Sequence, residues 1–148
     1  MHYCKLLVNW YNDMTTILIV DDSPTETAIL KMLFGAEPDL QVLGCAKNGL
    51  EAIDMTARLH PDLITMDINM PLMNGFEATR SIMSNNPTPI VVISSHLNNA
   101  EVNTTMLALD AGALSVLEKP KNISSPDFAV DKKNMLDIIR AMADVKVI

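Results

Sequence analysis

Short apolar runs, each followed by polar residues, recur along the chain. They cover residues 16–20, 41–46, 63–67, 90–93 and 113–117. Most positions within each run are apolar, instead of every second one, which is typical of parallel strands buried on both faces of a sheet. The pattern therefore predicts five buried strands in an α/β domain.

Helical patterns fill the intervals between these runs. Three of them open with a residue that can cap a helix, followed three residues later by glutamate. These pairs are Ser23 with Glu26, Asn48 with Glu51, and Asn74 with Glu77. Right-handed crossovers through such helices predict a doubly wound, five-stranded parallel sheet in the order 2-1-3-4-5, which is a flavodoxin-like three-layer sandwich.

Two further helices complete the alternation. One is expected to be capped by Asn98 or Asn99, to carry apolar residues at helical spacing and to end at Gly112. Its apolar residues are Val102, Met106, Leu107 and Leu109. The last helix is expected to cover about residues 131–145.

The composition of the chain narrows the classes of function. Its 148 residues and 49% hydrophobic content suit a single domain, which we place at residues 14–148. Residues 1–13 are expected to form an N-terminal extension outside the fold, with an extra strand or a cap as the alternative. The net charge of −7 and the lack of a Lys/Arg cluster argue against nucleic-acid binding. No apolar run approaches the roughly 20 residues of a membrane helix, and two cysteines suit a reducing cytoplasm.

Polar side chains follow the predicted strands at the edge where open α/β sheets keep their functional residues. These are Asp21 and Asp22 after the first strand, Asp67 at the end of the third, Ser94 after the fourth and Lys119 after the fifth. Two carboxylates about 4 Å apart repel by about 4 kcal/mol at an effective dielectric of about 20, so the aspartates need positive charge nearby. A hard divalent cation, Mg²⁺ or Mn²⁺, and Lys119 can supply it. The alternative is that Asp21 and Asp22 only cap the first helix or solvate a loop.

This arrangement suits phosphoryl transfer to Asp67. Beside a divalent cation, the Asp67 carboxylate can act as a nucleophile towards a phosphoryl group. Lys119 and the cation would stabilise the equatorial oxygens, and Ser94 would donate a hydrogen bond to one of them. The aspartyl phosphate adds a charge of about −1.5 to −2, which would draw in the loop of Ser94 and change the following helix and strand. The predicted chemistry is therefore that of a switch.

The same residues match the pattern of a known family. The matching features are Asp21 and Asp22, the run DINMPLMNG at 67–75, Ser94, and the pair KP at 119–120. Together they resemble the receiver domain of bacterial and archaeal response regulators, over about residues 14–145. This resemblance implies the same doubly wound fold as the apolar pattern predicts.

A closer resemblance rests on three longer stretches, at 70–83, 87–95 and 107–113. They are similar to the receiver of the chemotaxis protein-glutamate methylesterases, in which a receiver blocks a C-terminal esterase until it is phosphorylated. No G-x-S-x-G elbow of an esterase occurs in this sequence. The resemblance therefore implies either a receiver whose esterase domain is missing from the chain or a free-standing receiver.

The resemblance also implies a role for each part of the site. Asp67 is expected to be the phosphoacceptor, with a histidine kinase as its phosphoryl donor. Mg²⁺ is expected to bind Asp22 and Asp67 directly, Asp21 through water, and the backbone carbonyl of Asn69. The 119–120 peptide bond matches a family position that is often cis.

Five residues are expected to take part in the switch or to tune it. Ser94 and Lys119 match the switch hydroxyl and the phosphate-binding lysine of the family. Val116 lies three residues before that lysine, where the family usually has Tyr or Phe, so the usual coupling of an aromatic ring to the hydroxyl lacks its residue. His96 and Asn69 would border the phosphoryl group, and the hypothesis is that they set the lifetime of the aspartyl phosphate. A solvated loop position without a role is the alternative for His96.

Other readings of the site are weaker. The chain itself is expected to catalyse only its own phosphorylation and dephosphorylation at Asp67. An output domain or a partner protein is expected to dock on the fourth helix, the fifth strand and the fifth helix. A phosphatase of the haloacid dehalogenase type needs a second carboxylate two residues after the nucleophile, where this chain has Asn69. A nucleotide-binding module would need G-x-x-x-x-G-K-[ST] or G-x-G-x-x-G, and neither motif occurs.

Overall fold

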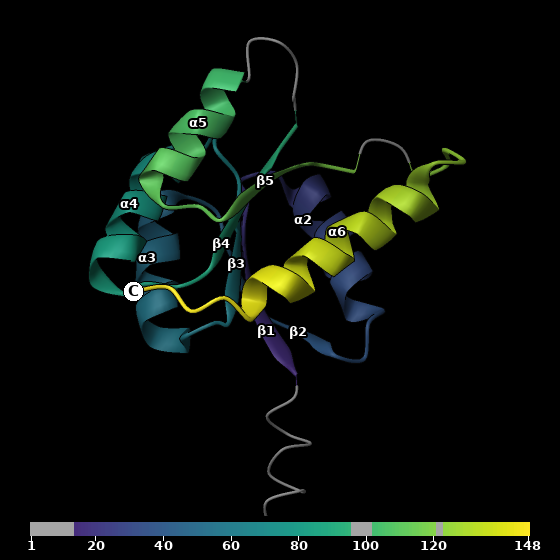
Figure 1. Cartoon of the computed structure of the whole chain (residues 1–148), viewed down its shortest axis with the longest axis horizontal. Coiled ribbons are helices and arrows are strands. Elements are labelled where there is room, and N and C mark those ends of the chain that lie inside the picture. The colour runs from purple at the N-terminus through teal and green to yellow at the C-terminus, as the bar shows by residue number, and fades with distance from the viewer. Residues whose placement is uncertain (1–13, 96–101, 121–122) are drawn as a thin grey trace, which may run out of the picture.

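Strands and helices alternate regularly along the chain (Figure 1). The structure is a computed structural model, and it describes residues 14–95, 102–120 and 123–148. Its elements are β1 (Thr15–Val20), α2 (Pro24–Gly35), β2 (Leu40–Ala46), α3 (Gly49–Leu59), β3 (Leu63–Met66), α4 (Gly75–Asn85), β4 (Ile90–Ser94), α5 (Val102–Ala111), β5 (Ser115–Glu118) and α6 (Phe128–Ala143). The expected extension at 1–13 and the expected caps at 98–99 lie outside the described residues, so both stay predictions.

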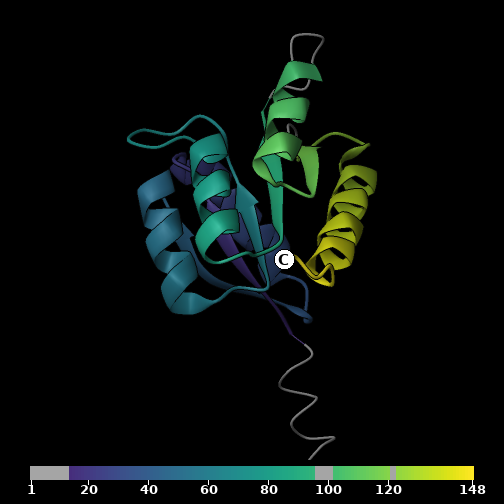
Figure 2. The same cartoon turned by 60° about the vertical axis from the view of Figure 1, so that its left-hand side comes forward.

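The five strands form one parallel sheet in the order β2-β1-β3-β4-β5. β1 lies inside the sheet, because its residues 17–20 pair with both β2 and β3. Helices α2 and α6 cover one face of the sheet, and α3, α4 and α5 cover the other (Figure 2). The predicted fold class, strand order and three-layer arrangement are confirmed.

Successive residues of β1 pack into two separate cores. Ile17 and Ile19 pack under α2 and α6, whereas Leu18 and Val20 pack under the three helices of the other face. All four side chains are at most 1% exposed. This burial on both faces explains why the strand sequences are apolar at nearly every position.

The fourth helix of the alternation, α5, packs on the sheet through small residues. Ala108 and Ala111 are 0% and 5% exposed, whereas Met106, Leu107 and Leu109 are 65%, 39% and 47% exposed. The three large side chains that lie at helical spacing are therefore not the ones that pack on the sheet. Residues 108 and 111 are one turn apart and share a face, and alanine there allows the helix to approach the sheet closely. The larger side chains consequently face outward.

The last helix begins earlier than the sequence pattern predicts. It runs from Phe128 to Ala143, compared with the expected range 131–145. The carbonyl of Asp127 already accepts from the N–H of Asp131 (3.0 Å), so the first turn forms without a side-chain cap. Among the described helices, this one included, none is both long enough and apolar enough to cross a membrane.

The fifth strand begins later than predicted. It covers Ser115–Glu118, whereas the apolar run suggested 113–117. Gly112 has a φ of +117°, and the N–H of Ala113 donates to the carbonyl of Ala108 (3.0 Å), which closes the end of α5. Because these residues finish the helix, strand pairing can start only after them.

Arg140 links the end of α6 to the connection between α2 and β2. Its Nε lies 2.8 Å and its Nη2 3.0 Å from the two carboxylate oxygens of Asp39, and Nη2 lies 2.8 Å from Glu37 Oε1. The hydrogen bond from Arg140 lowers the pKa of Asp39. The Asp39 side chain is 46% exposed, so water screens the pair and limits its contribution to about 0.5–1 kcal/mol.

We expect Arg140→Met to lower the free energy of unfolding by about 0.5–1 kcal/mol at pH 7. Because the folded pKa of Asp39 lies below its unfolded value, the loss should be present above a pH of about 4 and vanish as the pH falls through the folded pKa. Urea unfolding at pH 7 and at pH 3 measures both values. Lys133→Met, which removes an exposed pair with Asp137 on α6, is the control and should change stability less. An equal loss at both pH values would contradict the assignment.

Candidate functional site

The carboxyl ends of four strands meet at one edge of the sheet. Asp21 and Asp67 directly follow β1 and β3, and the N–H of Asp67 donates to the carbonyl of Val20 (2.9 Å). The N–H of Lys119, which follows β5, donates to the carbonyl of Ser94 at the end of β4 (2.8 Å). Sheet hydrogen bonding thus continues one residue past β3 and β5. It fixes the backbone from which the two oppositely charged side chains project.

Lys119 lies between three carboxylates. Its Nζ is 2.9 Å from Asp21 Oδ2 and 3.2 Å from Asp67 Oδ1, and it also contacts Glu26 Oε2 directly. Burial opposes the charged form of this amine, but its contacts with Glu26 and Asp21 outweigh burial and raise the pKa of Lys119. The lysine is therefore a permanent positive charge inside an acidic site.

Asp67 has too little positive charge around it to be an ordinary ionised aspartate. It is 8% exposed, and burial together with the negative charge of Asp21 raises the pKa of Asp67 to about 7. The ion pair with Lys119 and the hydrogen bond from the N–H of Ile68 (2.9 Å) lower the pKa but do not cancel these effects. The carboxylate would gain from one more cation in its surroundings.

Glu26 belongs to this site, although the sequence pattern had assigned it to a helix cap. The N–H of Glu26 donates to Ser23 Oγ (3.3 Å), so the predicted cap is present. The second hydrogen bond of a capping box, from the N–H of Ser23 to the Glu26 carboxylate, is absent. The N–H of Ser23 donates to Asp21 Oδ1 instead (2.9 Å). The carboxylate of Glu26 reaches Lys119 instead and accepts from Ser95 Oγ (3.4 Å). The capping-box role of its side chain was therefore wrong.

The matching glutamate of α3 shows what makes the difference. Glu51 Oε2 accepts from the N–H of Lys47 (2.7 Å) and stays at the start of its own helix. Two residues before the cap, α3 has Ala46, whereas α2 has Asp21, whose Oδ1 accepts from the N–H of the cap residue Ser23. An aspartate two residues before a serine cap is thus the sequence signal that could have identified Glu26 as a site residue.

A cleft of about 360 Å³ opens above these groups. Its lining residues are Asp22, Glu26, Asp67, Ile68, Asn69, Phe76, Ser94, Ser95, Thr104 and Lys119. Asp22 and Asn69 are exposed at this cleft, and Ser94 is half-buried. Val116 lies elsewhere: it pairs with Val92 of β4 and packs half-buried into the core under α3, α4 and α5. His96 lies outside the described residues, and its proposed role stays a prediction.

The donor atoms of the site fit a hard divalent cation. Asp21, Glu26 and Asp67 each offer a carboxylate oxygen, and these atoms lie within 4.8 Å of one another. Asp21 Oδ2 is buried and, within the described structure, has the ion pair with Lys119 but no hydrogen-bond partner of regular geometry. An all-oxygen donor set of this kind suits Mg²⁺ or Mn²⁺.

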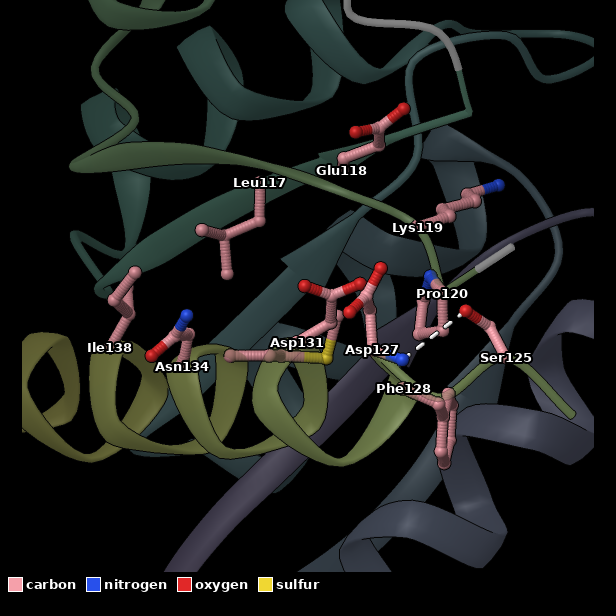
Figure 3. Close-up of a pocket in the computed structure, with 11 residues that line it drawn as sticks. Leu117, Glu118, Lys119, Pro120, Ser125, Asp127, Phe128, Asp131, Asn134 and Ile138 are labelled. Atoms are coloured by element: carbon pink, nitrogen blue, oxygen red, sulfur yellow. Dashed lines mark hydrogen bonds between the residues drawn. The ribbon is translucent and has the colours of Figure 1, made fainter. Parts of the chain in front are cut away.

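Lys119 also borders a second groove, of about 300 Å³, between β5 and α6. Figure 3 shows carboxylates of Asp127 and Asp131 gathered there, while the Lys119 amine points away from them towards the first cleft. The peptide bond between Lys119 and Pro120 is trans, so the expectation of a cis bond was wrong. The trans isomer is the one that X–Pro bonds favour by about 0.5–1 kcal/mol.

The strand order, the paired carboxylates and the buried lysine together are features of one class of α/β domain. The chain belongs to the response regulator receiver domain family, whose family model matches residues 17–125. The resemblance inferred from the sequence motifs is confirmed.

Its curated relatives are protein-glutamate methylesterase/protein-glutamine glutaminases. The chain is 49% identical over 137 residues to protein-glutamate methylesterase/protein-glutamine glutaminase 4 of Myxococcus xanthus, and the match covers 93% of this chain and 38% of that protein. It is 45% identical over 135 residues to protein-glutamate methylesterase/protein-glutamine glutaminase 1 of Syntrophus aciditrophicus, and that match covers 91% of this chain and 38% of that protein. The chain thus spans about 38% of the length of these relatives. The closer resemblance to methylesterase receivers is likewise confirmed.

Solved structures agree with these relatives. The response regulator domain of Thermotoga maritima CheB superimposes with a TM-score of 0.79 at 38% identity, covering 90% of this chain and 98% of that one. The receiver domain of a Pseudomonas aeruginosa sensor histidine kinase, solved with a magnesium ion coordinated in its active site cleft, has a TM-score of 0.72 at 21% identity. That similarity covers 89% of this chain and 99% of the other and bears on the fold alone.

Proposed function

We propose that this chain accepts a phosphoryl group from a histidine kinase on Asp67 and thereby regulates a chemotaxis methylesterase. The observation that supports it most strongly is the buried pair of Asp67 and Lys119, 3.2 Å apart, at the wall of an open cleft. A nucleophile and a fixed positive charge at this spacing can act on the same phosphoryl group.

The transfer is a displacement at phosphorus. One carboxylate oxygen of Asp67 forms a P–O bond while the P–N bond of the kinase phosphohistidine breaks, and the electron pair leaves with the imidazole. Lys119 pairs with the phosphoryl oxygens, and the Ser94 hydroxyl donates a hydrogen bond to one of them. The product is an acyl phosphate at Asp67.

Mg²⁺, or Mn²⁺ in its place, would be held by Asp22 and Asp67, by the carbonyl of Asn69 and, through water, by Asp21. When bound, it supplies positive charge to the phosphoryl oxygens and offsets the repulsion among the carboxylates. The cluster of carboxylate oxygens from Asp21, Glu26 and Asp67 supports a divalent cation at this edge of the sheet, and Asp22 and Asn69 line the adjoining cleft. Asn69, with His96, would set how quickly water reaches the acyl phosphate.

The output would follow from the added charge. A charge of about −1.5 to −2 on Asp67 attracts the Ser94 hydroxyl and, through β4 and β5, changes the position of α5. Val116 lies on this route without the aromatic ring of the family. The exposed Met106, Leu107 and Leu109 support a docking surface formed by α5, β5 and α6. We infer that a methylesterase domain of the same protein docks there, that the chain works in the cytoplasm, and that it binds neither nucleic acid nor membrane.

A free-standing receiver is the second candidate, because the same exposed side chains could equally receive a separate partner protein. In both cases the chain itself performs no turnover on another substrate. Hydrolysis of a phosphate monoester, whose leaving group is much poorer than acetate or imidazole, would instead favour a phosphatase.

The test is incubation of the chain with acetyl phosphate and Mg²⁺, followed by intact mass measurement. We expect one phosphoryl group per chain, stable in acid, labile in base and absent when the cation is chelated. Asp67→Asn should abolish the adduct. Asp62→Asn is the matched control, since Asp62 lies at the opposite end of β3 and binds Thr16, so it should keep the adduct. An unmodified native chain that still binds Mg²⁺ would refute the proposal.

A further inference from the structure

The side chain of Glu26 crosses the site from α2 to the far strands of the sheet. Its Oε2 contacts Lys119 after β5, and its Oε1 accepts from Ser95 Oγ after β4 (3.4 Å). The cap of α2 does not need this carboxylate, because Ser23 and Asp21 satisfy the helix start between themselves. The carboxylate is therefore committed to the site and not to its helix.

The charge at the cleft is strongly unbalanced. Asp22, Glu26 and Asp67 line it, and among the described lining residues Lys119 is the only cation. A phosphoryl donor that enters this cleft is itself anionic and needs the same lysine. Glu26 and the incoming phosphoryl group consequently compete for the same cation, the ammonium group of Lys119.

Of the three carboxylates around Lys119, Glu26 is the one that can leave. Its side chain is 34% exposed, whereas those of Asp21 and Asp67 are 1% and 10% exposed. The Glu26 carboxylate lies at the end of a flexible stem and can be rehydrated by turning outward. The two aspartates are fixed by the ends of β1 and β3.

We propose that Glu26 is a positioning residue that holds Lys119 in the unphosphorylated state and competes with the phosphoryl group for it, so that it limits the rate of phosphorylation. This inference rests on the proposed phosphoacceptor function of Asp67. Transfer requires Glu26 to release Lys119 and adds the repulsion of its charge to the approach of an anionic donor. Removing that charge should therefore accelerate transfer, and more so for donors of higher negative charge.

The experiment compares Glu26→Gln with the native chain at saturating Mg²⁺, which is established for each variant by titration. We expect the second-order rate constant with acetyl phosphate, a dianion, to rise about 3- to 10-fold at low salt. With phosphoramidate, which carries a single net negative charge at pH 7, the rise should be about 2-fold. High salt should reduce both increases, because the cleft is open to solvent.

Two control variants test whether the rate depends on the negative charge of residue 26 and on the position of that charge at the cleft. Glu26→Asp keeps the negative charge and should stay within about 2-fold of the native rate. Glu77→Gln removes a charge from the same helical position of α4, where the side chain is exposed and does not line the cleft, and should leave the rate unchanged.

An unchanged or slower rate in Glu26→Gln would overturn the inference while leaving Asp67 as the phosphoacceptor. The inference would also be overturned by a rate increase that does not depend on donor charge and salt, or by one that Glu77→Gln reproduces. A native chain that forms no adduct at all would overturn the proposed function, and this inference with it.

Discussion

Asp67→Asn is expected to raise the free energy of unfolding by about 2–4 kcal/mol at pH 8 without divalent cations. The native carboxylate is buried beside Asp21, and these two effects raise its pKa from 3.8 to about 7 in spite of Lys119. The folded state therefore holds an unfavourable charge at alkaline pH, and an uncharged amide of the same shape removes it. Thermal or urea unfolding of both chains measures the difference.

The pH dependence follows from the sign of the pKa shift. Because the folded pKa of Asp67 exceeds the unfolded value, its protonation stabilises the native chain fully below a pH of about 4, and this contribution is lost as the pH rises through about 7. The advantage of Asp67→Asn should accordingly be near zero at pH 4 and largest above pH 7. A constant difference across this range, or a less stable variant at pH 8, would contradict the electrostatic account.

Mg²⁺ should reduce the same difference. A ligand that binds only the folded chain stabilises it by about 2.7 kcal/mol at 100 times its dissociation constant. We expect this gain in the native chain and a much smaller one in Asp67→Asn. Equal stabilisation of both chains by Mg²⁺ would place the cation away from Asp67.

The second large effect is expected for Gly75→Ala, which should lower the free energy of unfolding by about 3 kcal/mol or more. Gly75 opens α4 and lies against the loop after β3, where its N–H donates to the carbonyl of Ile68 (2.8 Å). A Cβ at this position would lie 2.1 Å from the carbonyl oxygen of Asp67 and 2.9 Å from Ile68 Cα. These neighbours are backbone atoms and cannot move aside as a flexible side chain would, so the loop after Asp67 must open.

Gly35→Ala provides the matched control. Gly35 is the last residue of α2, and apart from its chain neighbours and the backbone of its own helix no heavy atom lies within 4 Å of the place a Cβ would take. Alanine there should change the free energy of unfolding by at most about 1 kcal/mol, on the stabilising side. Urea unfolding of both variants checks the contrast, and the yield of acetyl phosphate adduct should fall only in Gly75→Ala. Equal effects of the two substitutions would show that the contact at Gly75 is not tight.

The strand pattern predicted the sheet because burial on both faces leaves little freedom in the sequence. Ile17 and Leu18 must both be apolar, since they enter different cores. Once the strands are placed, the handedness of crossovers fixes their order. The meeting of Asp21, Asp67 and Lys119 then follows, because the carboxyl ends of parallel strands lie at one edge.

What the sequence could not predict depended on competition between neighbours. Glu26 suits a helix cap as well as Glu51 does, but Asp21 accepts from the Ser23 N–H and the carboxylate of Glu26 contacts Lys119. For α5 the difficulty was different. Its large apolar residues lie at helical spacing, but the buried residues of the helix are Ala108 and Ala111.

Four carboxylates lie at the cleft or directly below it, so the decisive measurement identifies the one that is phosphorylated. The chain is treated with acetyl phosphate and Mg²⁺, reduced with borohydride, which converts an aspartyl phosphate to homoserine, and mapped by peptide mass spectrometry. We predict homoserine at position 67 alone. Reduction at Asp21 or Asp22, a reduced product at Glu26, or no reduced residue in a chain that carries the phosphoryl mass would contradict the central claim.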